Sequence, residues 1–295
     1  MRSLGIAMSL ATVVMVAADE PDRTTTLATV LQRAGERVER YFARAQSIVC
    51  LEMVRLQPLT AGWSSDGIGR TVESELRLSW APAPDGAPPP DAHMLRQVLR
   101  VNGHKPRVND WNNCTAPEQQ TQEPQPLSLL LRSQRADYTF ELAGQARVDR
   151  RPAILLDYRV ITDVTVKTRL VEGREDCVSF DLEGGVRGRI WIDAETFDVL
   201  RLDQRLSGMV EIPLPKKLLR RSSGPTSWTM ERWDTEIRFK QVPFTNPDET
   251  LVLPSSMSSI RVTRGSGTPR LRTTTDYVSY QRFLTSGRII PHTPS

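Results

Sequence analysis

The hydrophobic pattern of this chain changes once, from a helical period to a strand period, and this limits the folds open to it. Between residues 24 and 47, apolar side chains recur every three or four residues, as on one helix face. After Ser47 the period falls to two, which is typical of strands with one buried face. The hydroxyls of residues 24–26 can cap the helix. The stripe comprises Leu27, Val30, Leu31, Ala34, Val38, Tyr41, Phe42 and Ala45.

The rest of the chain predicts about nine to eleven strands. Gly188–Asp193 and Phe197–Asp203 flank the turn 194–196 and form the clearest hairpin. Connections this short cannot make parallel crossovers, so the strands are expected to be antiparallel. Residues 81–91 and 106–126 are expected to be loops, and residues 127–134 a short helix. The predicted fold class is therefore mainly β (α+β), with the N-terminal helix packed across a large, strongly twisted antiparallel sheet.

The N-terminus resembles a secretory signal. Met1 and Arg2 precede an uncharged run from Leu4 to Ala18, which is too short to span a bilayer. We expect cleavage after Ala18, although an uncleaved anchor or a buried helix is the alternative. The predicted organisation is a signal peptide (1–18), one domain (19–284) and a C-terminal tail (285–295), with no transmembrane segment in the mature chain and a periplasmic or secreted location.

An exported chain can form disulfides, and this one has three cysteines. Cys50 alternates with Val54 and Leu56 and is expected to be a buried strand residue. Cys114 and Cys177 lie in polar, turn-like surroundings, so a bridge between them is the first choice. The alternative is three unpaired thiols.

Composition and motifs exclude several classes of function. The net charge of +4 is too small to indicate a nucleic-acid partner, and we expect none. The three histidines have no metal-ligand spacing, and no nucleophile elbow, dinucleotide fingerprint or Walker string occurs. We therefore expect no metal, no cofactor and no enzyme activity; a hydrolase built on carboxylates is the least favoured alternative.

One basic segment stands out against this near-neutral chain. Residues 213–224 contain four cations and no acid. Such a segment could face anionic headgroups or a carboxylate-bearing partner, and the alternative is a solvated hairpin loop. The candidate residues are Lys216, Lys217, Arg220 and Arg221.

Two hairpin segments carry a family resemblance. The chain resembles the periplasmic outer-membrane lipoprotein-sorting and carrier (LolA/LolB-like) superfamily in these two hairpins, RGRIWIDAETFDVLRLDQRLSG and FELAGQARVDRRPAILLDYRV, and in the closing strand TDYVSYQRFLTSG. The similarity covers roughly residues 24–284 in order of elements. It implies an incomplete barrel whose apolar concave side is covered by the helix and can hold acyl chains. The chain departs from compact carriers in its two long loops.

Two hypotheses follow for the function. The first is a cell-envelope protein that binds or carries a lipid, an acylated protein or another apolar ligand. The second is an envelope interaction or sensory module that grips a protein partner and has a filled core. The first hypothesis places the basic segment near the mouth of the half-barrel and assigns these lining residues: Leu76, Leu78, Trp80, Phe140, Leu142, Ile190 and Ile192.

Overall fold

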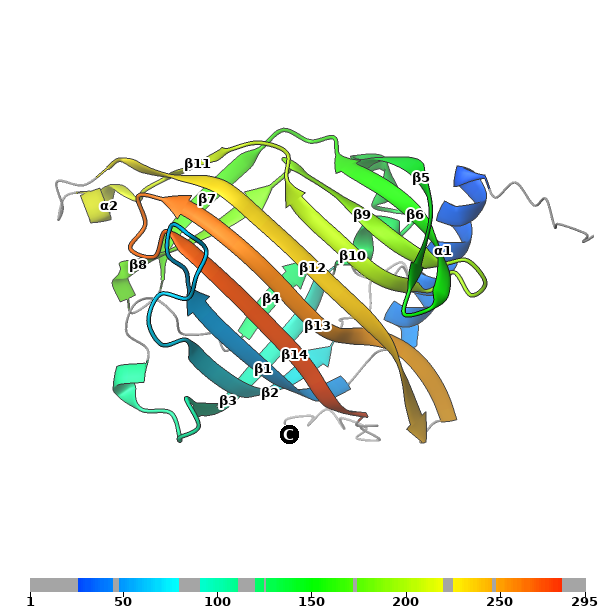
Figure 1. The fold of residues 1–295 in the computed structure, drawn as a ribbon, viewed down its shortest axis with the longest axis horizontal. Helices are drawn as coiled ribbons and strands as arrows, with labels where there is room; N and C mark the ends of the chain where they lie inside the picture. The colour runs from blue at the N-terminus through cyan, green and yellow to red at the C-terminus, as the bar shows by residue number, and fades with distance from the viewer. Residues whose placement is uncertain are drawn as a thin grey trace, which may run out of the picture.

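The computed structural model describes residues 26–44, 48–79, 91–110, 120–124, 126–171, 174–219, 225–245 and 248–282. One long helix, α1 (Leu27–Arg44), precedes a succession of strands (Figure 1). Thr26 caps it, because its Oγ1 accepts a hydrogen bond of 3.2 Å from the backbone N–H of Thr29. The predicted N-terminal helix is thus confirmed.

A twelve-stranded antiparallel sheet forms most of the remainder. Its strands are β1 (Ile48–Pro58), β2 (Arg70–Ser79), β3 (Asp91–Val101), β4 (Gln120–Pro124), β5 (Tyr138–Val148), β6 (Arg151–Val160), β9 (Val186–Asp193), β10 (Val199–Leu206), β11 (Val210–Pro213), β12 (Ser227–Thr245), β13 (Asp248–Arg264) and β14 (Arg270–Arg282). The order is β4-β3-β2-β1-β14-β13-β12-β10-β9-β6-β5, with β11 paired to β12. In the described part of the chain the edges β4 and β5 do not pair, so the sheet stays open and the predicted incomplete barrel is confirmed.

One face of this sheet packs against α1 and is called the α1 face below. Leu156, Ile190 and Leu202 lie in register on β6, β9 and β10 and are at most 1% exposed. They share one buried cluster with Val30 and Phe42 of the helix. Burying a large aliphatic side chain contributes roughly 1.5–3 kcal/mol, so this shared cluster stabilises the packing of the helix on the sheet.

A second, smaller cluster lies away from α1. The two-stranded hairpin of β7 (Thr165–Val171) and β8 (Arg174–Glu183) packs on it, toward the end of the molecule opposite α1 in Figure 1. Phe180 of β8 meets Trp233 of β12 edge to face, with ring centroids 6.4 Å apart. The buried members of the cluster are Leu206, Val210, Ile212 and Met230.

The structure also corrects the sequence predictions. Fourteen strands are described, against about nine to eleven expected. β4 lies inside the expected loop 106–126, and a 3-10 turn, Ser128–Leu130, replaces the expected helix at 127–134. Residues 80–90, which cover most of the expected loop 81–91, lie outside the described residues. Cys177 lies within β8 and is 1% exposed, not in a polar turn. β8 was missed because its outward side chains are charged, so the segment resembles surface loop.

Candidate functional site

The predicted lining residues gather on the α1 face. Leu76, Ile190 and Ile192 are at most 2% exposed and belong to the cluster beneath the helix. Leu78, Phe140 and Leu142 are partly buried and pack against the same cluster. Trp80 lies outside the described residues. The structure brings six of the seven side chains to one face, and their role as ligand contacts stays a prediction.

The turn between β9 and β10 is one docking point of α1. Asp193 Oδ1 accepts hydrogen bonds from the backbone N–H groups of Glu195 and Thr196, at 2.9 and 2.8 Å, which closes the turn. The Arg37 side chain donates to the Thr196 carbonyl at 2.6 Å. Arg33 lies over the ring of Phe197, 4.2 Å from its centroid. In this chain, the segment WIDAETFD therefore builds a platform for the helix.

A close backbone approach makes the second docking point. Gly35 faces the turn Ser128–Leu130, and a Cβ built on it would lie 2.8 Å from the Leu130 carbonyl oxygen. Arg135 donates to that carbonyl at 2.9 Å and also to the carbonyl of Leu31 in the helix. Gly35 thus allows α1 to lie close to the turn Ser128–Leu130.

Polar groups interrupt the apolar surface of the α1 face. Glu52 of β1 and Arg96 of β3 form a two-pronged ion pair, with Nε–Oε2 and Nη2–Oε1 distances of 2.8 and 3.3 Å. Their side chains are only 4% and 15% exposed. Ser74 lies in register with Glu52 on β2 and is 1% exposed, and its hydroxyl has no hydrogen-bond partner among the described residues. Buried polar groups are normally satisfied, so this hydroxyl retains binding capacity.

Cys50 lies two residues before Glu52 on the same strand face. It is a free thiol and is 1% exposed. Burial, followed by the charge of Glu52, raises the pKa of the thiol from 9.0 to about 12, against a smaller lowering effect of a hydrogen bond with Tyr280. The thiol is therefore neutral at ordinary pH.

The raised pKa predicts that Cys50 reacts slowly with alkylating reagents. At pH 8 we expect iodoacetamide to alkylate the folded protein at least about a thousandfold more slowly than the unfolded chain, because the reactive thiolate is that much rarer. The unfolded thiol also loses its proton at lower pH than the folded thiol. The free energy of unfolding should then fall by about 1.4 kcal/mol per pH unit above pH ~9, a slope that Cys50→Ala removes. Rapid alkylation of the folded protein at pH 8, measured by mass spectrometry, would contradict the burial of this thiol.

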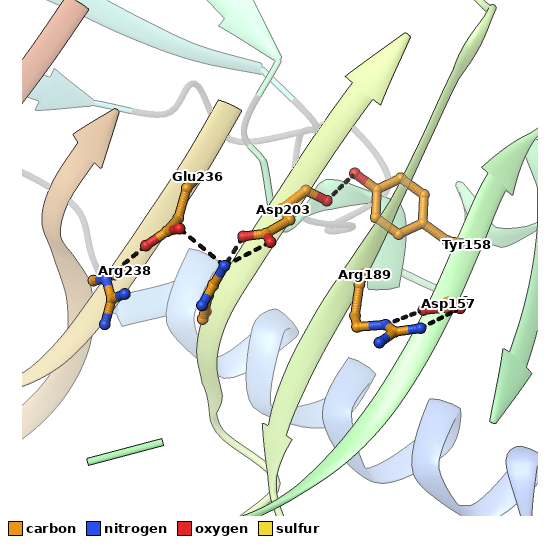
Figure 2. A network of polar contacts seen from close by, with 7 residues as sticks. Asp157, Tyr158, Arg189, Asp203, Glu236 and Arg238 are labelled. Atoms are coloured by element: carbon orange, nitrogen blue, oxygen red, sulfur yellow. Dashed lines mark hydrogen bonds and ion pairs between the residues drawn. The ribbon is translucent and has the colours of Figure 1, made fainter. Parts of the chain in front are cut away.

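The opposite face of the sheet carries a ladder of ion pairs (Figure 2). Arg189 of β9 donates to both oxygens of Asp157 on β6, at 2.5 and 2.8 Å. Arg201 of β10 binds Asp203 in the same two-pronged way and reaches Glu236 of β12 at 2.9 Å. The hydrogen bond from Arg189 is the main cause of the lowered pKa of Asp157. Each ladder residue is adjacent in sequence to a residue of the α1 face, so its side chain points away from the helix.

An open depression of about 790 Å³ lies on this opposite face. It is built from β5, β6, β9, β10, β12 and β13 and includes the Trp191 indole, on which Arg201 stacks at 4.3 Å from the ring centroid. Besides the ladder, three arginines line it: Arg159, Arg187 and Arg205. Sequence reasoning took these charged side chains for a solvated face and missed the depression.

The other predicted site residues are only partly described. Lys216 and Lys217 begin the one-turn helix α2 (Lys216–Leu219), and Arg220 and Arg221 lie outside the described residues. Cys177 is disulfide-bonded, and its predicted partner Cys114 also lies outside them. Within the described ranges, no group of three or more His, Cys, Asp or Glu side chains could hold a metal ion. In the same ranges, no helix is long and apolar enough to cross a membrane.

Comparison with known proteins gives a faint likeness in structure. No family model matches the chain, and no curated protein matches it either. Among solved structures, a putative outer membrane lipoprotein-sorting protein domain from Vibrio parahaemolyticus is 11% identical, with a TM-score of 0.37 over 88% of this chain and 94% of that one. A LolA superfamily protein from Nitrosomonas europaea is 10% identical, with a TM-score of 0.32 and the same coverages.

A third similar structure contains a complex of two proteins. MucA/MucB of Pseudomonas aeruginosa matches at 11% identity and a TM-score of 0.23, over 85% of this chain and 99% of that one. The names of the first two structures are those of the superfamily that the hairpin motifs resemble. Every TM-score is below 0.5, so the roles of residues and the function are inferred from the geometry above and not from these likenesses.

Proposed function

We propose that this is an exported cell-envelope protein that binds an amphiphile, an acyl chain with a polar head, on the α1 face. The observation that carries the proposal is the mixture of side chains there. A broad apolar surface contains a few convergent polar groups, as ligand sites for apolar molecules do. Export is inferred from the signal-like residues 1–18.

The polar groups define where the head would lie. The Ser74 hydroxyl can donate to an ester or amide carbonyl, and the neighbouring Glu52–Arg96 pair supplies charge in a buried setting. Leu76 and Leu78 continue from Ser74 along β2, at the next two positions of the same strand face. An acyl chain laid along them would enter the hydrophobic cluster that these two leucines share with α1.

Uptake of phospholipid tests the proposal. The purified protein is incubated with dispersed phosphatidylethanolamine, and the bound lipid is counted by native mass spectrometry. Leu78→Asp should lower the bound fraction by about tenfold or more, because a carboxylate would then face the chain. The matched control is Leu95→Asp, since Leu95 is 40% exposed on β3 and should tolerate the charge. No uptake by the unaltered protein would contradict phospholipid binding, and equal losses in both variants would exclude the α1 face as the binding site.

The helix should act as the cover of this site. Gly35→Val would push α1 from the Leu130 carbonyl and is expected to speed both lipid uptake and alkylation of Cys50 by about tenfold, the effect of losing about 1.4 kcal/mol of closure. Ala28→Val, at an exposed position of the same helix, is the control for β-branching. If Gly35→Val alters neither rate, α1 is a fixed part of the core and not a cover.

A protein partner is the second candidate. Leu76, Ile190 and Ile192 are at most 2% exposed, so the α1 face is closed in this structure, as expected of an interaction module with a filled core. Under this reading the protein binds no phospholipid. Leu78→Asp would then only destabilise it, which thermal unfolding separates from a binding defect.

A further inference from the structure

Three arginines lie side by side on the face opposite α1. Arg187 of β9 is directly paired with Arg159 of β6 on one side and with Arg205 of β10 on the other. Each is two residues from a ladder member on its own strand, so all three point to the same face as the ladder. Like charges directly opposite one another destabilise a sheet, so this arrangement needs a compensating partner.

Four of the five carboxylates that line the depression are engaged by other arginines, and the fifth, Glu141 on β5, lies opposite Asp157. Asp157 is bound to Arg189, and Asp203 to Arg201. Asp234, the residue opposite Arg205, accepts a hydrogen bond of 2.6 Å from Arg232. Ion pairing therefore neutralises the charges of the ladder. The row formed by Arg159, Arg187 and Arg205 takes no part in this pairing.

No partner of the row appears in the described part of the chain. The guanidinium groups of Arg159, Arg187 and Arg205 form no hydrogen bond or ion pair there. The charge of Arg205 reaches Asp157 only as a minor cause of its lowered pKa. The Nε of Arg187 is buried and meets no acceptor within the described ranges. A buried, unsatisfied donor of a charged group is costly, and an anion in the depression would satisfy it.

We propose that the depression binds a phosphate group carried on an organic molecule, with Arg187 at its centre. Forked guanidinium groups match the oxygens of a phosphate, and three of them converge here from adjacent strands. A volume of about 790 Å³ accommodates more than one phosphate ion, and Trp191 offers an aromatic surface to the attached group. This site lies across the sheet from the α1 face and does not depend on the amphiphile proposal.

The test compares a variant that lacks the three arginines of the row with a variant that lacks three arginines elsewhere on the surface. Binding of glycerol 3-phosphate is measured by calorimetry for the protein, for the variant Arg159→Gln/Arg187→Gln/Arg205→Gln, and for the control Arg55→Gln/Arg100→Gln/Arg132→Gln. The control residues are exposed arginines outside the depression, so both variants lose the same formal charge. We expect binding to weaken at least about tenfold in the row variant and by less than about twofold in the control.

Two further measurements complete the design. Removing the like charges should raise the Tm of the row variant by about 2–4 °C, which shows that it folds and that the row is kept at a cost in stability. Vesicles of phosphatidylglycerol, compared with phosphatidylcholine, distinguish a lipid headgroup from a free organic phosphate. Equal binding by the two triple variants, or no binding of glycerol 3-phosphate and of phosphatidylglycerol vesicles by the unaltered protein, would overturn the proposal.

Discussion

Replacing Glu52 by alanine is expected to lower the free energy of unfolding by about 3–5 kcal/mol. The Arg96 guanidinium would keep its charge inside the α1 face after losing the carboxylate that it contacts twice. Taking a charge out of water costs several kcal/mol, and the attraction between Glu52 and Arg96 offsets this cost for both side chains. Urea unfolding followed by circular dichroism measures the loss.

Two controls separate the buried pair from ordinary ion pairing. Glu183→Ala breaks the Lys167–Glu183 pair, whose side chains are 66% and 61% exposed, and should leave the urea midpoint almost unchanged. Glu52→Met/Arg96→Met removes both buried charges and should recover most of the stability. A double variant as unstable as Glu52→Ala would show that the pair is needed for folding. A stable double variant that binds no phospholipid would assign the pair to the ligand.

The parts of the fold that the sequence predicted are those where one strand face is apolar. The hairpin around Asp193 is visible because alternation on both sides meets a short polar turn. β7, β8 and β11 were missed because they are short or carry charges on the outward face. Phe180 of β8 packs against Trp233, a residue of a distant strand, so no local pattern reveals this contact.

The two candidate sites differ in the same way in how far the sequence predicts them. The apolar lining of the α1 face could be listed because each member follows the strand period. The arginine row could not, because it exists only where β6 lies beside β9 and β9 beside β10. Two intervening strands separate β6 from β9 along the chain, and the sequence does not tell which strands become neighbours. The one available signal was the outward alternation of Arg201, Asp203 and Arg205, which by itself describes a solvated face.

Gly188 is one of the backbone positions that line the depression. It lies opposite Tyr158 on β6 and Gln204 on β10. Without a side chain there, the Tyr158 ring can lean across β9, and its hydroxyl donates to the Asp203 carbonyl at 3.4 Å (Figure 2). A Cβ at residue 188 would overlap that carbonyl oxygen and lie 2.7 Å from the tyrosine ring. Gly188→Ala should therefore cost about 3 kcal/mol of unfolding free energy.

The control for this substitution is Gly208→Ala, because a Cβ there meets nothing within 4 Å, and its effect should stay within about 0.5 kcal/mol. Tyr158→Leu combined with Gly188→Ala should restore only part of the loss, since the Asp203 carbonyl belongs to the backbone and cannot withdraw as a side chain can. Full restoration would mean that the ring alone defines the close approach. Because Gly188 separates Arg187 from Arg189, β9 can relieve the overlap only by moving both guanidinium groups, so glycerol 3-phosphate binding should weaken even where the variant remains folded.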